Sequence, residues 1–254
     1  MSEAREYLQA DQPAGVPPLA LTGGRTLPDA DEEKYRVRRQ LAVHEWIAER
    51  VPGQDVVDMA CGEGYGTGVL ARRAARVTGV EANPGAFEHA RLKYTEPGVR
   101  FVRDLVGVYA EPCDAVVFLQ TIEHLTEPAT VVRHFKEMLR PGGAAYVSTP
   151  NLLTLAPEGA EKSGNPWHVK EYRAQELREL CESVFSHVQL LGLFHARKLR
   201  AHELALAAGW DGLHARLKIT KPFYERFTPA IAASDFALRE DDLDRALDFV
   251  AVLR

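Results

Sequence analysis

The 254-residue sequence lacks the features of several specialised protein classes. Its three cysteines, Cys61, Cys113 and Cys181, are too few and too scattered for a disulfide framework or a zinc site. No apolar run reaches the length of a membrane span, and the first residues contain no signal-peptide core. A net charge of −5 gives no sequence-wide attraction to nucleic acid or anionic membrane. We therefore expect a cytoplasmic protein without nucleic-acid or membrane partners, and the oligomeric state stays open.

What the sequence does contain is an alternation of apolar runs and helical patterns. A doubly wound, Rossmann-like α/β fold with a seven-stranded, mostly parallel sheet is the predicted architecture, because repeated strand–helix units form parallel sheets. Near-continuous apolar strands suit a sheet that is buried on both faces. The expected strands are 56–60, 77–82, 99–105, 114–120, 144–151, 188–194 and the C-terminal run, and the expected helices are 30–51, 67–75, 85–93, 128–139, 174–185 and 241–249.

Four regions follow from this pattern. Residues 1–29, rich in Pro, Gly and Ala, are expected to be a flexible tail. Residues 30–195 form the core with an N-terminal helical lid. Residues 196–240 fall between two candidate strands and are expected to be an inserted cap that holds the acceptor, with basic and aromatic side chains on its wall. Residues 241–254 supply the last helix and strand of the core.

A glycine-rich turn follows the first strand, in the segment DVVDMACGEGYG. Asp58, Gly62, Gly64 and Gly66 give the spacing D-x-x-x-G-x-G-x-G, and Glu81 ends the next strand. Glycines let the backbone approach a ligand closely, and a carboxylate at the second strand end accepts hydrogen bonds from ribose hydroxyls. The NAD fingerprint G-x-G-x-x-G fits less well, because Asp58 would repel a phosphate but suit a ligand with an amino group. No P-loop motif is present.

Five segments in order resemble the class I S-adenosylmethionine (SAM) methyltransferases: VVDMACGEGYG, VTGVEAN, FVRDL, DAVVFLQTIEHL and LRPGGAAYVSTPN. The resemblance covers about residues 50–195 and departs from the family at Ala60, where glycine is common. It implies SAM as cofactor and S-adenosylhomocysteine as product. Asp104 is placed at the adenine, with a helix cap as the alternative role. The implied cofactor-binding residues are Asp58, Ala60, Gly62, Gly64, Glu81, Ala82, Asp104, Leu105 and Gln120.

The whole chain resembles an actinobacterial subgroup associated with O-methylation of glucose units in intracellular methylglucose polysaccharides. The segments that carry this are LTGGRTLPDADEEKYRVRRQ, NPWHVKEYRAQEL, GLFHARKLR and the terminal SDF…DDLDRALDFVAVLR. By this resemblance Tyr35, Arg38 and Arg39 close over the cofactor, and an arginine pairs with the methionine carboxylate. The alternative is that they form a solvated helix face.

Methylation of a sugar hydroxyl benefits from a general base. His124 lies in the segment where the family places the acceptor, and His168 lies in the loop after the fifth strand. Each has a packing role as its alternative, and His195 is a third candidate. Trp167 is expected to stack on a sugar face. Glu123, His124 and His168 are possible ligands without a strong metal spacing, so metal independence is expected.

The sequence thus predicts a SAM-dependent O-methyltransferase that acts on a sugar or glucan hydroxyl. One alternative is methylation of a small phenol or quinone precursor. The other is a SAM-binding module without catalysis. Methylation of RNA is disfavoured by the negative net charge and by the lack of an asparagine-proline-proline tetrapeptide after the fourth strand.

Overall fold

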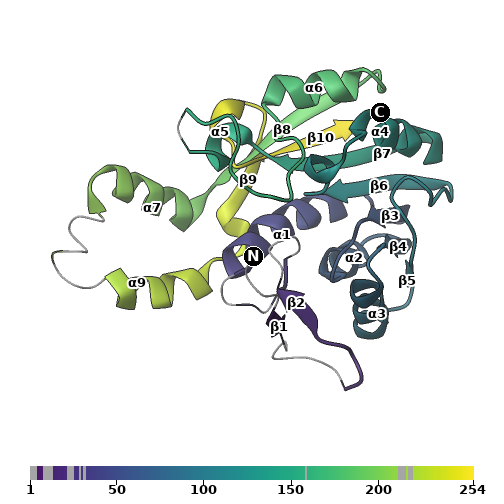
Figure 1. The fold of residues 1–254 in the computed structure, drawn as a ribbon, viewed down its shortest axis with the longest axis horizontal. Coiled ribbons are helices and arrows are strands. Elements are labelled where there is room, and N and C mark those ends of the chain that lie inside the picture. Colours follow the sequence, from purple (N-terminus) through teal and green to yellow (C-terminus); the bar gives the residue numbers. More distant parts are fainter. Residues whose placement is uncertain are drawn as a thin grey trace.

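The protein is described by a computed structural model that covers residues 5–7, 14–21, 26–28, 30, 33–157, 159–210, 216 and 220–254. Its centre is a sheet of eight strands in the order β5-β4-β3-β6-β7-β10-β8-β9 (Figure 1). Strand β10 runs antiparallel to β7 and β8, and β9 runs antiparallel to β8. The strands are β3 Asp55–Met59, β4 Arg76–Val80, β5 Val99–Val102, β6 Cys113–Leu119, β7 Leu139–Pro150, β8 Val188–His195, β9 Phe236–Arg239 and β10 Asp248–Leu253.

The doubly wound, mostly parallel sheet is confirmed, but the expected number of seven strands is wrong. The eighth strand, β9, comes from the end of the expected cap. Phe236–Arg239 pairs with Gly192–His195 at the edge of the sheet. Phe236 is buried there, whereas its neighbour Ala237 is exposed, which is the alternation of an edge strand with one solvated face. The segment is only four residues long, too short to give a clear pattern in the sequence.

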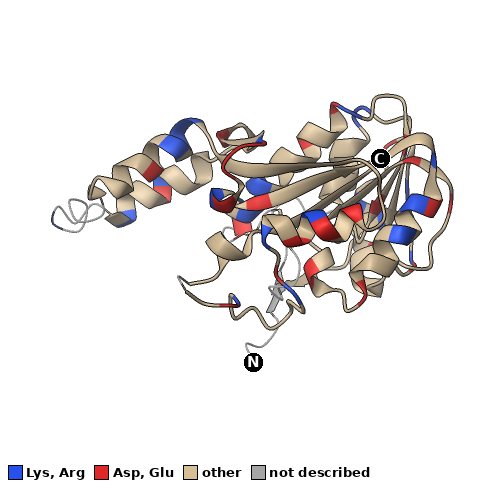
Figure 2. Cartoon of the chain, turned by 90° about the horizontal axis from the view of Figure 1, so that it is seen from above, with Lys and Arg blue, Asp and Glu red and all other residues tan. Residues whose placement is uncertain are grey.

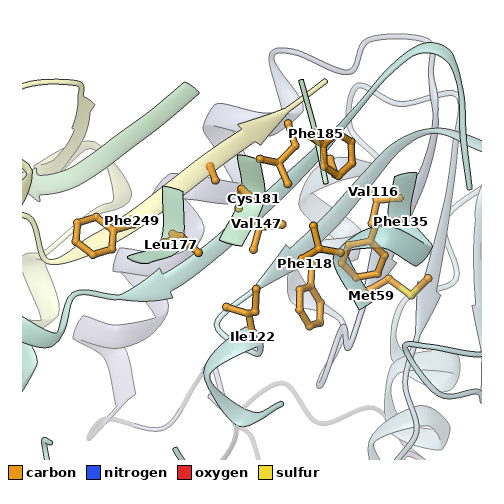
Figure 3. Packing of buried hydrophobic residues seen from close by; sticks show 14 of the residues in the cluster. Met59, Val116, Phe118, Ile122, Phe135, Val147, Leu177, Cys181, Phe185 and Phe249 are labelled. Atoms are coloured by element: carbon orange, nitrogen blue, oxygen red, sulfur yellow. The ribbon is translucent and has the colours of Figure 1, made fainter. Parts of the chain in front are cut away.

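Helices cover both faces of the sheet (Figure 1). Helices α4 and α6 pack on one face, where Phe118, Phe135, Leu177 and Cys181 belong to one buried cluster (Figure 3). Helices α1 and α2 pack on the other face through a second cluster, and α3 packs against β5. The helices of the core are α1 Lys34–Ala48, α2 Tyr65–Leu70, α3 Pro84–Lys93, α4 Pro128–Met138, α5 Leu152–Leu155 and α6 Ala174–Glu182.

Local signals in the sequence explain where several elements begin. Asn83 caps α3 by accepting a hydrogen bond from the Ala86 amide, and Pro84 occupies the first helical position. The expected turn at residues 140–143 instead lies within β7 as an irregularity, where pairing passes from Cys113–Leu139 to Ala115–Ala144. The expected helix at 241–249 is wrong. Only Leu243–Arg245 form a 3-10 turn, and β10 begins at Asp248 because its six residues are all buried between two strands.

The described part of the N-terminal segment packs against the core. Strand β1 (Arg5–Tyr7) pairs with β2 (Leu19–Leu21). Leu19 and Leu27 are buried with Ala86 of α3, and the Pro17 carbonyl is 2.8 Å from His89 Nδ1. The flexible tail expected for residues 1–29 therefore contains a segment that is anchored to α3. The other residues of this tail lie outside the described part of the chain.

Helices α7 (Arg197–Ala207) and α9 (Thr220–Phe227) form an arm between β8 and β9 that projects away from the sheet (Figure 1). His202, Phe223 and Phe227 stack where the two helices meet, with centroids 4.7 Å apart for His202 and Phe227. Lys218, one of the basic residues of the expected cap, lies outside the described residues. Among the described helices, none has the length and apolar character that a membrane span requires. Basic and acidic residues are interspersed along the chain (Figure 2).

Candidate active site

The glycine-rich loop after β3 contains several residues in the left-handed backbone region. Gly62 and Gly64 have φ of 59° and 97°, a conformation that glycine adopts without steric cost. Ala60, with φ 55°, adopts it despite its Cβ. A Cβ added at Gly62 would meet no atom within 4 Å, so that side of the loop is open. One added at Gly66 would lie 2.1 Å from His44 Nε2, so Gly66 lets α1 approach α2 closely.

A cavity of about 370 Å³ opens beside this loop. It lies at the carboxyl ends of β3, β4 and β6, where doubly wound sheets bind their ligands. Side chains from five places in the chain meet around it: α1, the glycine loop, the ends of β4 and β6, the segment after β7, and the start of β10. The lining includes Arg36, Arg39, Gln40, His44, Asp58, Ala60, Gly62, Glu81, Gln120, Glu123, His124, Leu155, Asn165, His168 and Asp248.

Two carboxylates shape the half of the cavity next to the glycine loop. Glu81 accepts the Gly62 amide on Oε2 at 2.9 Å and the Asn83 amide on Oε1 at 2.8 Å. Each of its oxygens keeps a further lone pair for a ligand hydroxyl. Asp58 is buried and accepts from Thr67 Oγ1 at 2.6 Å. Burial raises the pKa of Asp58 to about 7, so a cationic ligand group would favour its ionised form.

The structure brings only part of the expected cofactor set together. Asp58, Ala60, Gly62, Glu81 and Gln120 line the cavity, whereas Gly64, Ala82, Asp104 and Leu105 lie outside its lining. Asp104 comes two residues after β5, the strand beside β4, and its Oδ1 accepts from the Leu105 amide at 2.8 Å. A turn rather than a helix follows it, which removes the helix-cap alternative. Leu105 is 60% exposed.

Helix α1 contributes one face to the cavity, and it is not the face expected. Tyr35 and Arg38 are absent from the lining. Tyr35 instead pairs with His195 Nε2 at 2.6 Å, and Arg38 is exposed. Arg39 lines the cavity but binds both carboxylate oxygens of Asp248 at 2.5 Å. On α1, sequence reasoning missed Arg36, Gln40 and His44. Each follows the one before by four residues, and Arg39 lies three after Arg36, so this helical spacing was the available signal.

The other half of the cavity holds Glu123, His124 and His168. A 3-10 helix, Ile122–His124, follows β6, and Glu123 is buried within it. The Val169 and Lys170 amides both donate to the Glu123 carbonyl, at 2.8 and 3.1 Å, and so hold the loop after β7 against this helix. His168 is thereby placed beside His124, with ring centroids 5.1 Å apart. One ligand atom from each of the three residues lies within 4.8 Å of the others.

Hydrogen bonds fix the protons on both imidazoles. His124 Nδ1 is 2.7 Å from the Trp167 carbonyl, which can only accept, so Nδ1 carries the proton. His168 Nδ1 is 2.7 Å from the Glu171 carboxylate and donates to it. The Asn165 amide faces the lone pair on His168 Nε2 at 2.9 Å, since its oxygen already accepts from the Trp167 amide. In the neutral tautomer that these bonds select, each ring has its lone pair on Nε2. Burial raises the pKa of Glu123 to about 8.

Sequence comparisons agree with this geometry. A family model described as "Methyltransferase domain" matches residues 32–204. This chain belongs to that family. A probable S-adenosylmethionine-dependent methyltransferase of Mycolicibacterium smegmatis is 37% identical over 92% of the chain and 94% of its own length. A probable S-adenosylmethionine-dependent methyltransferase of Mycobacterium tuberculosis is 34% identical over 92% of the chain and 89% of its own length. The protein is therefore a SAM-dependent methyltransferase, as its sequence predicted.

Relatives with a named acceptor match a smaller part of this methyltransferase. A ubiquinone biosynthesis O-methyltransferase of Xylella fastidiosa is 35% identical over 46% of the chain and 52% of its own length. Solved structures share the fold. A possible histamine N-methyltransferase of Thermotoga maritima has a TM-score of 0.58, 14% identity and coverage of 88% and 93%. Magnesium protoporphyrin IX methyltransferase of Synechocystis, with bound S-adenosylhomocysteine, has a TM-score of 0.51 and 20% identity. This match covers 64% of the chain and 79% of that structure.

The sequence places the acceptor site in residues 196–240. None of the described residues of that region lines the cavity. The half of the cavity that holds Glu123, His124 and His168 is bordered by the segment after β7, where Leu153, Leu155, Trp167 and Val169 are exposed. Sequence reasoning identified Trp167 and His168 in this segment but missed Glu171, which accepts from His168 Nδ1. Its spacing of three residues from His168 was the one available signal.

Proposed function

We propose that this methyltransferase transfers the methyl group of SAM to a hydroxyl oxygen of a sugar or glucan. The glycine loop, Asp58 and Glu81 hold the cofactor, and Arg36 pairs with its methionine carboxylate. The acceptor enters past the segment after β7. Its oxygen forms a bond to the methyl carbon while the carbon–sulfur bond breaks, which leaves S-adenosylhomocysteine. The hydroxyl is activated for this attack beside the group formed by Glu123, His124 and His168, and its proton leaves the site.

The observation that carries this proposal is the hydrogen bond between His124 and Trp167. The Trp167 carbonyl oxygen lies 2.7 Å from His124 Nδ1 and fixes the tautomer of the neutral ring. In this tautomer the lone pair of His124 Nε2 is available to activate a hydroxyl. Trp167 is itself 57% exposed, and its neighbours in the chain Asn165 and His168 line the cavity. An exposed aromatic ring can pack on the apolar face of a pyranose. A platform for the sugar and a group that activates its hydroxyl are thus joined directly. The two mycobacterial relatives, which span nearly the whole chain, accord with the actinobacterial resemblance.

A second candidate acceptor is a small phenol or quinone precursor. Leu155 lines the cavity and is 38% exposed, and Leu153 and Val169 are exposed nearby. These apolar side chains would suit an aromatic acceptor. The partial match to ubiquinone biosynthesis O-methyltransferases points the same way. The described basic residues of the arm do not line the cavity, so their charge does not argue against this acceptor.

The two acceptors are separated by an assay with methyl-labelled SAM and two pools. One pool contains α-1,4-gluco-oligosaccharides of graded length, and the other contains phenols and quinone precursors. Label in the oligosaccharides is the expected result, and it would fall at least tenfold in Trp167→Ala with SAM affinity unchanged. Label only in the aromatic pool would reject the sugar proposal. Label in neither pool, together with tight SAM binding, would favour the non-catalytic alternative.

A further inference from the structure

Glu123, His124 and His168 form a group whose geometry goes beyond that of a general base. A base needs one imidazole with one orienting partner. Here two imidazole nitrogens and a carboxylate from separate segments converge within 4.8 Å. From these ligand atoms and their supporting bonds, we propose that the group binds a divalent first-row transition-metal ion. This departs from the metal independence that the sequence suggested. The site itself follows from the geometry alone, whereas its role in catalysis rests on the proposed function.

The hydrogen bonds around the two histidines are those of metal ligands. A metal-bound histidine usually donates its second ring N–H to a carboxylate or a backbone carbonyl, which fixes the ring and its tautomer. His168 donates to the Glu171 carboxylate, and His124 donates to the Trp167 carbonyl. Glu171 is in turn held by Ser163, whose amide donates to Oε2 at 2.8 Å. Both Nε2 lone pairs are thus presented by rings that cannot turn away.

Glu123 supplies the carboxylate oxygen that would bind the cation beside the two imidazoles. Its side chain is only 2% exposed and accepts from Thr149 Oγ1 at 3.0 Å. The charged neighbours that act on it, Asp248 and Glu171, are also acidic. A buried carboxylate without a cationic partner is costly, and a bound metal ion removes that cost. The opposing positive group nearby, Arg39, is already occupied by both oxygens of Asp248.

The ligand set indicates which ions fit. Two imidazoles and one carboxylate suit Zn²⁺, Fe²⁺ or Co²⁺ better than Mg²⁺, which prefers oxygen ligands. Ligand atoms around one such ion lie roughly 3–3.5 Å apart, given bonds of about 2.1 Å. The largest separation, up to 4.8 Å, would therefore shorten by roughly 1.5 Å, and His168 Nε2 would exchange its contact with Asn165 for the ion. Three protein ligands leave a position open toward the cavity, as in catalytic sites.

The open position gives the ion its role in methyl transfer. An acceptor hydroxyl that binds there has its pKa lowered by the metal, and its proton leaves to solvent. The resulting oxygen then attacks the methyl carbon, and the carbon–sulfur bond breaks. The two histidines hold the ion in this reaction and do not themselves take the proton.

The site is tested by Co²⁺ titration of the chelator-treated full chain, followed by visible absorption. Wild type is expected to bind one equivalent. Glu123→Gln, His124→Ala and His168→Ala are each expected to weaken binding at least tenfold. Glu171→Gln, which contacts His168 alone among the three ligands, is expected to weaken it roughly 10–100-fold, as supporting residues do. His187→Ala is the matched control. His187 is exposed and precedes β8, at the amino end of the strand and away from the carboxyl ends that border the cavity.

Retained binding of S-adenosylhomocysteine shows that each variant is folded. Absence of a Co²⁺ band in wild type, or equal bands in all the variants, would overturn the metal site. If the Glu123 and histidine variants lose the Co²⁺ band but the wild-type enzyme labels no sugar, the metal site stands and the proposed acceptor is rejected. Activity that persists in chelator, with the Co²⁺ site intact, would overturn the role of the ion in catalysis.

Discussion

At the scale of single residues, two non-glycine residues that line the cavity have backbone angles in the left-handed region. Ala60 follows β3 with φ 55°, and Gln120 follows the neighbouring β6 with φ 52°. Both line the cavity. Such conformations cost about 1–3 kcal/mol and concentrate at functional sites. At Ala60 the sequence departs from the family's usual glycine, and the backbone angle explains why glycine is common there.

Ala60→Gly is therefore expected to raise the free energy of unfolding by about 1 kcal/mol, because it removes the strain of a Cβ at positive φ. Denaturant unfolding at equilibrium measures this change. The matched control is Ala201→Gly, at an exposed position within α7, where the same substitution should lower stability by about 1 kcal/mol. Destabilisation by both substitutions would contradict the strain assigned to Ala60.

Asp58 gives the unfolding free energy a pH dependence of definite sign. Its pKa rises to about 7 in the folded protein through burial, so the folded state holds this proton more tightly than the unfolded state. The stabilisation that protonated Asp58 gives the folded state is complete below its pKa in the unfolded chain, about 4. As pH rises from there toward 7, the free energy of unfolding falls by up to about 1.4 kcal/mol per pH unit. Asp58→Asn should flatten this slope in the cofactor-free protein. An unchanged slope would show that Asp58 is ionised.

At the scale of elements, the contact between α1 and α2 closes one side of the cavity. It depends on Gly66, because a Cβ there would lie 2.1 Å from the imidazole of His44. His44 is buried, and burial lowers its pKa to about 4. Its neutral ring lies between the two helices and reaches the cavity.

Gly66→Ala should lower the free energy of unfolding by about 1–3 kcal/mol through this overlap. His44→Ala removes the ring, so the double substitution should cost clearly less than the sum of the two single ones. Urea denaturation of the four proteins gives the coupling. Strict additivity would mean that the backbone of α2, and not the ring of His44, limits the space at Gly66.

Elements with their own local signals were predictable, and those defined by pairing were not. The apolar runs of β3, β4, β6 and β7 and the capped helix α3 could be found because periodicity, Pro84 and Asn83 mark them. Strand β9 and the 3-10 turn before β10 could not, since their conformation depends on partners elsewhere in the sheet. The segment 241–249 has the apolar spacing of a helix, but β10 gains more from pairing with two strands.

At the scale of the whole molecule, the topology decides which distant residues share the cavity. The glycine loop and Glu81 could be joined from the sequence, because strand ends of a parallel sheet meet at one edge. The pairing of His124 with His168 depends on how the loop after β7 returns to the Glu123 carbonyl, which no local pattern encodes. For the same reason the sequence did not reveal that the described residues of the arm lie outside the cavity lining.

The arm and the α1 face should therefore differ in their effect on cofactor affinity. Arg36→Ala is expected to weaken SAM binding about tenfold or more, the usual effect of losing a hydrogen bond to a charged group. Phe227→Ala, which disturbs the aromatic stack of the arm, should leave the SAM dissociation constant within twofold. Isothermal titration calorimetry measures both. Equal losses would place the arm over the cofactor.

The central claim is that the cavity is divided into a cofactor half and an activating half. Steady-state kinetics and calorimetry on wild type, Glu81→Ala, Glu123→Gln and the control His187→Ala test it, with whichever acceptor takes up label. We expect Glu123→Gln to lower kcat at least a hundredfold while S-adenosylhomocysteine affinity stays within threefold, and Glu81→Ala to weaken cofactor affinity at least tenfold. Normal turnover in Glu123→Gln, or a parallel loss of cofactor affinity, would contradict this division.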